Sequence, residues 1–419
     1  MIEMKDSGIE WIGVIPAHWE IKRLKSIFSE CKDLSSTGEE DLLSVSEYYG
    51  VARRLDIKED DEFDSRADSL EGYKICKKND LVINIMLAWK RGLGFSDYDG
   101  IVSPAYAVYR GKNIIPHYYH YLLRTDRYIA EFKRNSKGII DSRLRLYSDR
   151  FFNIKTIVPP LAEQQAIADY LDKKTAEIDE QITALEKKSD AYQRLKRSLI
   201  SEVITRGLNP TAELKDSGIE WIGEIPEHWE IDRVKSFAKT IKGKSCDYLS
   251  DPTTDCYQVL SVESLRQDEC QFYDYVKVDD DSQICSPDDI VVIWDGAGVG
   301  EFLRAKNGAL SSTIAKVKFT SKKVLPKYFW YWRYKIEYRL KSIPTGMGIP
   351  HLNPNLLNNY KIAIPPLVEQ QAIADYLDKK TAEIDSNISA ISSKIDAYKR
   401  LKQSLIDEVV TGKRRIEKA

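Results

Sequence analysis

Two long stretches of the chain carry hydrophobic residues at every seventh position. In the first stretch a second series follows four residues later, and the two series are Leu171, Ile178, Leu185, Tyr192 and Leu199, and Thr175, Ile182, Ser189, Lys196 and Val203. The same pattern returns 206 residues further on, at 377–405 and 381–409. This 4-3 spacing is typical of a coiled-coil seam. It predicts two helices of about 44 residues, each roughly 65 Å long.

Neither predicted helix has the composition to stand alone. A helix with a single apolar stripe gains most of its stability from packing, and the nearest candidate for each is the other. Because a whole domain separates them in sequence, we expect an antiparallel pair within the chain, with a globular region at each end and a pseudo-twofold axis.

The regions 21–158 and 231–364 share a pattern of elements despite little sequence identity. Each has a short apolar run typical of a buried strand, DLVINIM from Asp80 and DIVVIW from Asp289. Further strand-like stretches begin at Gly100 and Gly308, and an aromatic-rich helix is expected after a proline in each. The predicted fold class is α+β, with two globular α/β-type domains separated by the two long antiparallel coiled-coil helices.

Two internal repeats set the predicted boundaries. Residues 159–179 and 365–385 are identical at 20 of 21 positions, and residues 5–26 and 215–236 at 18 of 22. The second repeat contains two tryptophans and turn-forming Gly and Pro, which favours a domain-entry motif packed on the core. The predicted domains are 1–160, the central helix 161–207, the second domain 208–366 and the distal helix 367–419.

Composition adds few constraints. The chain has 419 residues, 42% of them hydrophobic, and no apolar run long enough to span a bilayer or arranged as a signal peptide, so we expect a cytoplasmic protein. Its six cysteines form no CxxC pair, which predicts reduced thiols and no metal site. The net charge of -2 gives no global indication of nucleic-acid binding.

Charge is nevertheless segregated within each half. Residues 39–71 contain 12 acidic and 4 basic residues, and 247–289 contain 12 and 2. The balance inverts to 11 basic and 4 acidic in 110–155, and to 12 and 1 in 304–361. Basic residues interleaved with aromatic ones suit a surface that meets phosphates, although the aromatics also fit a helix packed on a core.

The motifs that suggest catalysis or cofactor binding are each incomplete or better explained by structure. GKS at 243–245 lacks the upstream glycine of a phosphate loop, because that position is Ala238. DGAGVG from Asp295 follows an apolar strand like a nucleotide or S-adenosylmethionine turn, but the first half has no counterpart. HYYH at 117–120 is explained by a helix face. We identify no nucleophile and base in a catalytic arrangement, and no metal ligands.

The order of elements resembles the specificity subunit of a Type I restriction-modification system. The repeated PPLAEQQAIADYLD and PPLVEQQAIADYLD are similar to the family's proximal helical motif, and the segments from Asp80 and Asp289 to central parts of its target-recognition domains. The resemblance covers nearly the whole chain.

This resemblance implies a subunit with no catalysis of its own. Each target-recognition domain would read one half of a split, asymmetric site in double-stranded DNA, while the helices would act as spacer and docking platform for two methyltransferase subunits. Up to two ATP-dependent translocating nuclease subunits would join them. S-adenosylmethionine, ATP and Mg would belong to these partners, with no cofactor in this chain and no membrane.

Two sets of candidate site residues follow. We expect DNA contacts from Lys90, Arg91, Lys137, Arg143, Arg145 and Tyr147 in the first half, and Lys242, Lys244, Arg304, Lys306, Thr345 and His351 in the second. The polar residues that recur in both copies of the repeated helix predict methyltransferase docking by Glu163, Gln164, Gln165, Asp172, Glu369, Gln370, Gln371 and Asp378.

Two other functions remain open at this point. The glycine turn from Asp295 would be used if the chain were itself an S-adenosylmethionine-dependent DNA methyltransferase. Alternatively, the two domains would bind acidic proteins on a non-catalytic scaffold, and no salt-dependent affinity for duplex DNA would then be measured.

Overall fold

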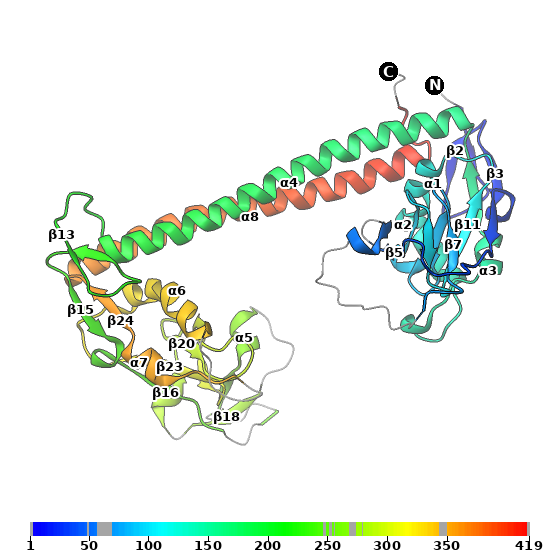
Figure 1. The fold of residues 1–419 in the computed structure, drawn as a ribbon. Coiled ribbons are helices and arrows are strands. Elements are labelled where there is room, and N and C mark those ends of the chain that lie inside the picture. Colours follow the sequence, from blue (N-terminus) through cyan, green and yellow to red (C-terminus); the bar gives the residue numbers. More distant parts are fainter. Residues whose placement is uncertain are drawn as a thin grey trace. The chain divides into compact units, whose positions relative to one another are not determined.

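The computed structural model describes residues 3–47, 50–56, 69–245, 249–250, 254, 256–267, 274–278, 280–342 and 350–416. The chain divides into two compact units. Unit 1 comprises residues 1–186 and 393–419, and unit 2 comprises 187–392. Each unit therefore contains one globular domain together with a part of each long helix (Figure 1).

The two predicted long helices are α4 (Leu161–Arg206) and α8 (Leu367–Val410), of 46 and 44 residues. The heptad positions from Leu171 to Val203 are all buried or half-buried, whereas most residues between them are exposed. The same holds for the corresponding positions of α8. The coiled-coil seam predicted from the sequence is thus confirmed.

Within each unit the helix segments run antiparallel. In unit 1 the Lys402 ammonium lies 2.6 Å from the Asp179 carboxylate, and in unit 2 Lys196 lies 2.6 Å from Asp385. Both lysines occupy seam positions, and a carboxylate of the facing helix forms an ion pair with each ammonium group. The two pairs are the same contact made by the two copies of the repeat.

The globular domain of unit 1 is built from short antiparallel strands. A four-stranded sheet has the order β4-β11-β8-β9, and the remaining pairs are β1-β2, β3-β12, β5-β6 and β7-β10. The strands are β1 (Met4–Asp6), β2 (Val14–Pro16), β3 (Glu20–Arg23), β4 (Phe28–Cys31), β5 (Leu43–Ser46), β6 (Gly50–Arg53), β7 (Lys74–Cys76), β8 (Leu81–Asn84), β9 (Leu93–Phe95), β10 (Gly100–Val102), β11 (Tyr106–Gly111) and β12 (Lys155–Val158).

Unit 2 repeats the central sheet with the order β16-β23-β20-β21 and adds a second four-stranded sheet, β18-β17-β22-β19, in which β17 and β22 run parallel. The pairs β13-β14 and β15-β24 complete it. The strands are β13 (Leu214–Asp216), β14 (Glu224–Pro226), β15 (Glu230–Arg233), β16 (Ala238–Lys242), β17 (Cys256–Leu260), β18 (Tyr275–Lys277), β19 (Ile284–Cys285), β20 (Ile290–Ile293), β21 (Phe302–Arg304), β22 (Gly308–Leu310), β23 (Ile314–Phe319) and β24 (Lys361–Ile364).

The apolar runs from Asp80 and Asp289 become β8 and β20, whose residues are all buried. They occupy the same place in the two central sheets, which explains why both read as unbroken hydrophobic segments. The shared sheet order confirms that domains with divergent sequences have a common α+β framework.

Short helices complete each domain. Proline begins the predicted aromatic helices, which form α1 and α2 in unit 1 but the single α6 in unit 2. The helices are α1 (Pro116–Leu123), α2 (Asp126–Asn135), α3 (Ser148–Asn153), α5 (Val262–Arg266), α6 (Pro326–Ser342) and α7 (Pro354–Asn359), with 3-10 turns η1 (Leu24–Ser26), η2 (Arg54–Asp56), η3 (Ala88–Lys90), η4 (Asp141–Arg143), η5 (Val234–Ser236) and η6 (Asp281–Gln283).

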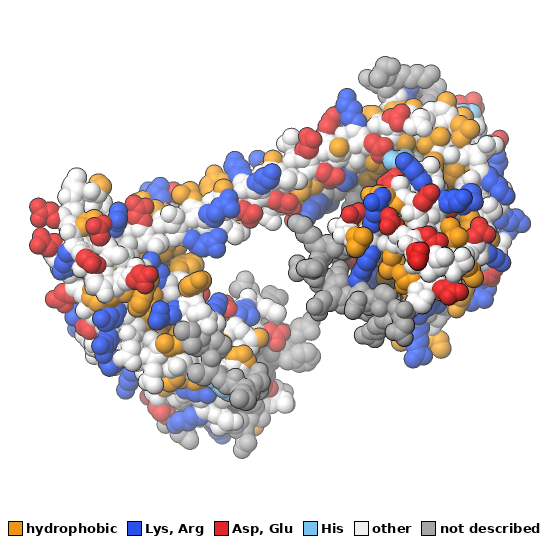
Figure 2. All heavy atoms as spheres, in the orientation of Figure 1, with side chains coloured by type: hydrophobic (Ala, Val, Ile, Leu, Met, Phe, Trp, Pro, Cys, Tyr) orange, Lys and Arg blue, Asp and Glu red, His pale blue; other side chains and the backbone are white. Residues whose placement is uncertain are grey.

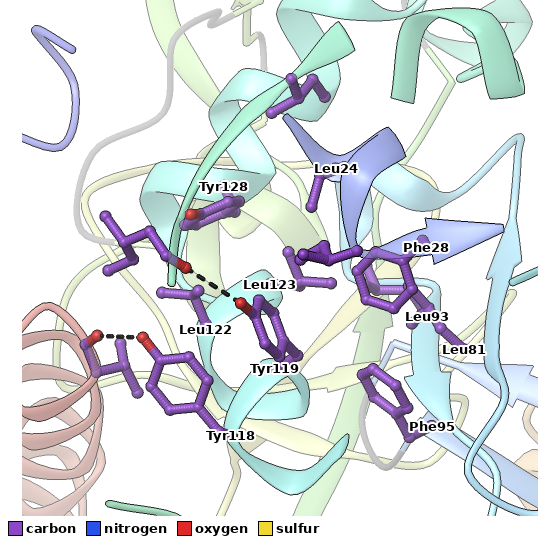
Figure 3. Packing of buried hydrophobic residues seen from close by; sticks show 14 of the residues in the cluster. Leu24, Phe28, Leu81, Leu93, Phe95, Tyr118, Tyr119, Leu122, Leu123 and Tyr128 are labelled. Atoms are coloured by element: carbon purple, nitrogen blue, oxygen red, sulfur yellow. Dashed lines mark hydrogen bonds between the residues drawn. The ribbon is translucent and has the colours of Figure 1, made fainter. Parts of the chain in front are cut away.

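The core of unit 1 joins the globular domain to the end of α8. Tyr118 and Tyr119 are fully buried among leucine and phenylalanine side chains (Figure 3). The Tyr118 hydroxyl donates to the Val410 carbonyl at 2.9 Å, and the Tyr119 hydroxyl to the Ile157 carbonyl at 3.2 Å. The aromatic residues of this basic segment therefore serve the core, one of the two interpretations that the sequence left open.

Candidate nucleic-acid interface and repeated helix face

The structure brings four of the predicted DNA-contact residues of unit 1 into one loop, 137–147. The backbone N–H groups of Lys137 and Arg145 each donate to the other's carbonyl at 2.9 Å, which closes the loop. Lys137, Arg143 and Tyr147 are exposed, and the tip carries Ile139, which is 100% exposed. An apolar tip flanked by cations offers both phosphate contacts and apolar contact with a base edge.

Trp89 connects this loop to the other two predicted residues, Lys90 and Arg91. The ammonium groups of Lys90 and Lys133 both lie 5.0 Å from its ring. Lys133 also forms a 2.9 Å ion pair with Asp141 within the loop. Trp89 and Lys133 thus link Lys90 to the loop 137–147, and we name the six predicted residues of unit 1 the unit 1 basic face.

Arg91 has a partner within its own unit. Its backbone is left-handed, with φ of 63°, and its guanidinium binds the Asp126 carboxylate. Trp89 and Lys133 could not be predicted as members of this surface, because α2 and η3 approach each other only through the tertiary fold.

In unit 2 Asp295 gathers two predicted residues. Its carboxylate lies 2.8 Å from the Lys242 ammonium and 2.6 Å from the His351 ring nitrogen. Hydrogen bonds from these two groups hold the pKa of the Asp295 carboxyl below its usual range against the opposing effect of burial. In the sequence Asp295 was noted only as the first residue of the DGAGVG turn. In the structure its carboxylate binds both Lys242 and His351.

The glycine turn after Asp295 has a structural explanation. Gly296 has φ of 93°, and its N–H donates to the Pro350 carbonyl at 2.9 Å. A side chain at Gly300 would come within 2.7 Å of the Leu340 Cβ atom. Close packing and a left-handed backbone therefore require these glycines without any bound nucleotide.

The other predicted residues of unit 2 lie elsewhere. The Arg304 guanidinium stacks 4.3 Å over the Trp330 ring, and Lys244 lies 3.7 Å from Asp280. The Lys306 ammonium donates to backbone carbonyls at the end of α5, 2.7 Å from that of Ser264, so it has a structural role. Thr345 lies outside the described residues.

The acidic and basic segments of the sequence do not produce a surface of one charge sign on the side of the molecule that Figure 2 shows. Figure 2 shows Lys and Arg side chains of each unit interspersed with Asp and Glu. Electrostatic attraction of DNA would therefore come from local groups of cations, and the unit 1 basic face is such a group.

The repeated segment anchors each long helix to its own domain through three polar contacts, and the first involves glutamate. The Glu163 carboxylate accepts from the Trp19 indole at 2.9 Å and lies 2.7 Å from His18. Glu369 makes the same pair of contacts with Trp229 and His228, at 3.0 and 2.7 Å. This explains why the two internal repeats recur together, and the burial of Trp19 and Trp229 confirms that the repeat at 5–26 and 215–236 packs on the core.

The second contact buries an amide completely. The Gln164 side chain accepts from the Ile115 N–H at 2.9 Å and donates to the Pro159 carbonyl at 2.7 Å, and it is 0% exposed. Gln370 repeats this with the Leu325 N–H at 2.8 Å. A buried side chain cannot contact a docked partner. Gln164 and Gln370, which were predicted to contact the methyltransferase, are both fully buried.

The third contact involves Asp172, which accepts from the Tyr121 hydroxyl at 2.8 Å, and Asp378, which accepts from Tyr331. The carboxylates of Glu163, Asp172 and their counterparts in α8 thus also accept hydrogen bonds from residues of their own unit. From the residues that are exposed in both copies we select four per helix and name them the repeated helix face: Leu161, Gln165, Ala166 and Asp169 in α4, and Leu367, Gln371, Ala372 and Asp375 in α8.

Replacing Gln164 by Leu should lower the apparent free energy of unfolding by about 2–4 kcal/mol, because it leaves a buried N–H and a buried carbonyl without partners. Gln165→Leu is the matched control, since Gln165 is exposed and its side-chain amide donates to Asp169, and it should change stability by less than about 0.5 kcal/mol. Urea denaturation of both variants measures the difference. Equal stabilities would contradict the anchoring role of Gln164.

The described residues offer little for metal or thiol chemistry. Within them, no group of three or more His, Cys, Asp or Glu residues could hold a metal ion. Burial raises the pKa of the Cys76 thiol to about 12 and that of Cys285 to about 11, so both are protonated at neutral pH. No helix in this part of the chain is long and apolar enough to cross a membrane.

Comparisons with known proteins agree with this architecture. The family described as "Type I restriction modification DNA specificity domain" matches residues 16–187 and 226–396, one match for each repeat. The specificity subunit of the type I restriction enzyme MjaVIII from Methanocaldococcus jannaschii is 34% identical over 188 residues, which span 45% of this chain and 43% of that relative. The putative MjaX specificity subunit from the same organism is 24% identical, over 97% of this chain and 96% of its own.

Two solved structures share the fold over almost the whole length. One, from work on complex assembly and conformational transition of the type I R-M system, has a TM-score of 0.72 at 16% identity and covers 96% of this chain and 99% of its own. The HsdS subunit from Thermoanaerobacter tengcongensis has a TM-score of 0.52 at 18% identity, with 96% and 98% covered. The chain belongs to the family of Type I restriction modification DNA specificity proteins, and DNA specificity is its function.

Proposed function

We propose that this chain is the recognition subunit of a Type I restriction-modification complex, in which each unit reads one half of a bipartite, asymmetric DNA site. The observation that carries the proposal is that the DNA specificity family matches once in each unit, on a common central sheet whose surrounding loops differ. A common framework with different loops is what two half-sites of different sequence require.

Recognition would divide between phosphates and bases. Lys and Arg side chains at phosphates set affinity and its dependence on salt, whereas base edges in the major groove distinguish all four base pairs. In unit 1 we assign both contacts to the loop 137–147, because exposed cations flank its apolar tip. In unit 2 we assign them to the cluster of Lys242 and His351 on Asp295.

Replacing Arg143 and Arg145 by Ala together should weaken binding of cognate duplex by about tenfold, because each loses a cation at the proposed DNA surface. Assembly with the methyltransferase should be unchanged. Lys25→Ala provides a control, since Lys25 is exposed on η1 and outside the proposed surface. A gel-shift titration that gives the double variant the affinity of the control would remove loop 137–147 from the interface.

The methyltransferase subunits would dock on the repeated helix face. Its residues are identical in α4 and α8, and identical surfaces suit two copies of one partner. In unit 2 this face borders a hollow of about 530 Å³ lined by Leu325, Leu367 and Ala372. Exposed apolar groups beside polar ones are typical of a docking surface.

Catalysis would belong to the partners. We propose that two methyltransferase subunits bring S-adenosylmethionine and methylate adenine N6, and that up to two nuclease subunits bring ATP and Mg. Calorimetric titration of the isolated chain with S-adenosylmethionine tests this division, and we expect no heat of binding. Tight binding without partners would instead favour a methyltransferase in its own right.

A further inference from the structure

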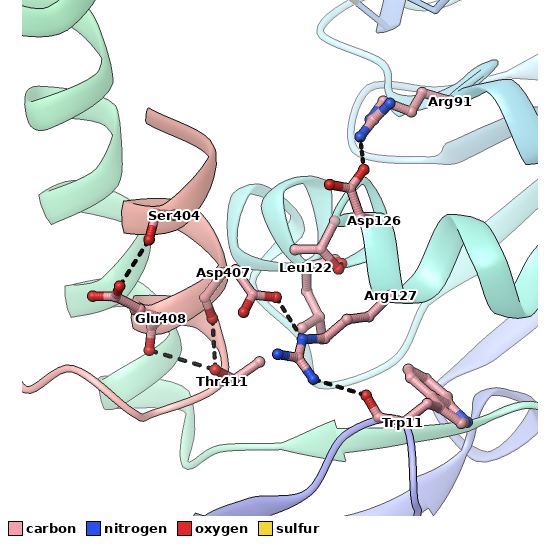
Figure 4. Close-up of polar contacts among 10 residues, drawn as sticks. Trp11, Arg91, Leu122, Asp126, Arg127, Ser404, Asp407, Glu408 and Thr411 are labelled. Carbon is pink, nitrogen blue, oxygen red and sulfur yellow. Dashed lines mark hydrogen bonds and ion pairs between the residues drawn. The ribbon is translucent and has the colours of Figure 1, made fainter. Parts of the chain in front are cut away.

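Unit 1 contains a cavity of about 970 Å³ where the globular domain meets the last turns of α8. Residues of η3, α1 and α2 form one part of its lining, and residues 400–407 of α8 form the other. Figure 4 shows the polar contacts on this side of the molecule, with Asp126 and Arg127 from α2 and Asp407 from α8. The cavity therefore joins a recognition domain to a helix whose expected role is spacing.

The lining is strongly basic. It contains six Lys and Arg residues and three Asp and Glu residues. The cations are Lys90, Arg91, Arg124, Arg127, Arg400 and Lys402. At His120, which also lines the cavity, burial and the nearby Arg124 charge lower the pKa to about 3, so this ring adds no charge at neutral pH.

Three of these cations have carboxylate partners within the unit. Arg91 pairs with Asp126, Arg127 with Asp407 at 2.8 Å, and Lys402 with Asp179. Arg124 donates to the backbone carbonyls of Arg91 and Glu47 at 2.9 and 2.7 Å. Such pairs hold the walls of the cavity in place.

Lys90 and Arg400 differ from the others. Both are exposed, and among the described residues neither forms an ion pair with a carboxylate. They come from η3 and from α8, so the two elements each present an uncompensated charge to the same cavity. An anion held between them would gain two charge-assisted contacts.

The corresponding groove in unit 2 is also basic, but other residues supply its charge. It lies between α6 and residues 197–204 of α4 and has a volume of about 420 Å³. Its lining combines apolar groups, among them Ile200, Trp221 and Tyr338, with Arg197, Lys335 and Arg339. Arg194 is the counterpart of Arg400 in the repeat, and it does not line that groove. Both grooves therefore carry an excess of cations, and what is particular to unit 1 is the pairing of Lys90 with Arg400.

We propose that this cavity binds phosphate groups of the DNA backbone, so that α8 contributes Arg400 directly to DNA binding by unit 1. The inference rests on the proposed function and assigns a second role to the helix. Duplex DNA is favoured because Lys90 belongs to the unit 1 basic face, through Trp89, Lys133 and the loop 137–147. A backbone that crosses this face would present successive phosphates to the loop and to the cavity.

The test compares Arg400→Ala with Arg194→Ala in the full chain assembled with its methyltransferase. Binding of a cognate and a scrambled duplex is titrated at several salt concentrations. We expect R400A to weaken both duplexes by the same factor, about three- to tenfold at low salt, and to reduce the slope of log K against log salt by about 0.9. K90A should behave like R400A, and R194A like the wild type.

Other outcomes have distinct meanings. Equal salt slopes for R400A and R194A would overturn the proposal. Loss of methyltransferase from R400A with unchanged duplex affinity would also overturn it, and would assign the cavity to an acidic segment of a protein partner. If the wild-type complex itself failed to distinguish the cognate from the scrambled duplex, the proposed function would fail instead.

Discussion

Inserting one heptad into each long helix, after Glu186 in α4 and after Ser392 in α8, is expected to lengthen the spacer between the two DNA half-sites by about three base pairs. Seven residues add about 10.5 Å of helix at 1.5 Å per residue, and duplex DNA rises 3.4 Å per base pair. A complete heptad in both helices keeps every seam residue facing its partner, so the coiled coil remains intact.

Methylome sequencing of cells that carry the double insertion provides the measurement. The two half-site sequences should be unchanged and only the spacer should lengthen. A four-residue insertion in α4 alone serves as the control, because it shifts seam residues such as Leu199 by about 6 Å along an α8 that has not been lengthened, and it should reduce methylation at every site. An unchanged spacer in the double-insertion variant would show that the helices do not act as the ruler.

Replacing Ala166 and Ala372 by Arg is expected to release both methyltransferase subunits from the complex, and each single replacement should release one. Both alanines are exposed in the repeated helix face, and Arg is a good helix former, so the helices should persist while two large charged side chains block docking. The mass of the assembled complex, measured by light scattering after gel filtration, reports the number of bound subunits.

The chain supplies a matched control for this experiment. Ala184 and Ala390 occupy equivalent exposed positions in α4 and α8 but lie outside the repeated segment. Arg at these two positions should leave the complex complete. If the Ala166 and Ala372 variant also retained both subunits, docking would have to occur on another surface. Replacing Glu163 or Gln164 would not be informative, because either change disrupts the anchor of its own domain.

The sequence predicted the helices well because heptad periodicity is a local signal. Each heptad position from Leu171 to Val203 is buried or half-buried, as its place in the seam requires. The recurrence of Glu163 and Gln164 could not be explained in the same way. Their partners Trp19 and Ile115 lie 144 and 49 residues away, and a single sequence gives no measure of such distances.

Prediction of the DNA surface succeeded only where candidates were close in the chain. Lys137, Arg143, Arg145 and Tyr147 meet because they belong to one loop. Lys306 was selected for its charge alone, and the structure shows its ammonium bound to the end of α5. Charge and proximity to a turn do not reveal whether a lysine faces solvent or a helix carbonyl.

The division of α8 between the units has a consequence for biosynthesis. Unit 2 is one uninterrupted segment, 187–392, whereas unit 1 needs residues 393–419 to be complete. Leu405, Val409 and Val410 belong to the same buried cluster as Tyr118. During translation the first domain to leave the ribosome would thus be the last to close its core, while unit 2 has its whole sequence available earlier. A premature stop near residue 400 would damage the amino-terminal domain and leave the sequence of unit 2 intact.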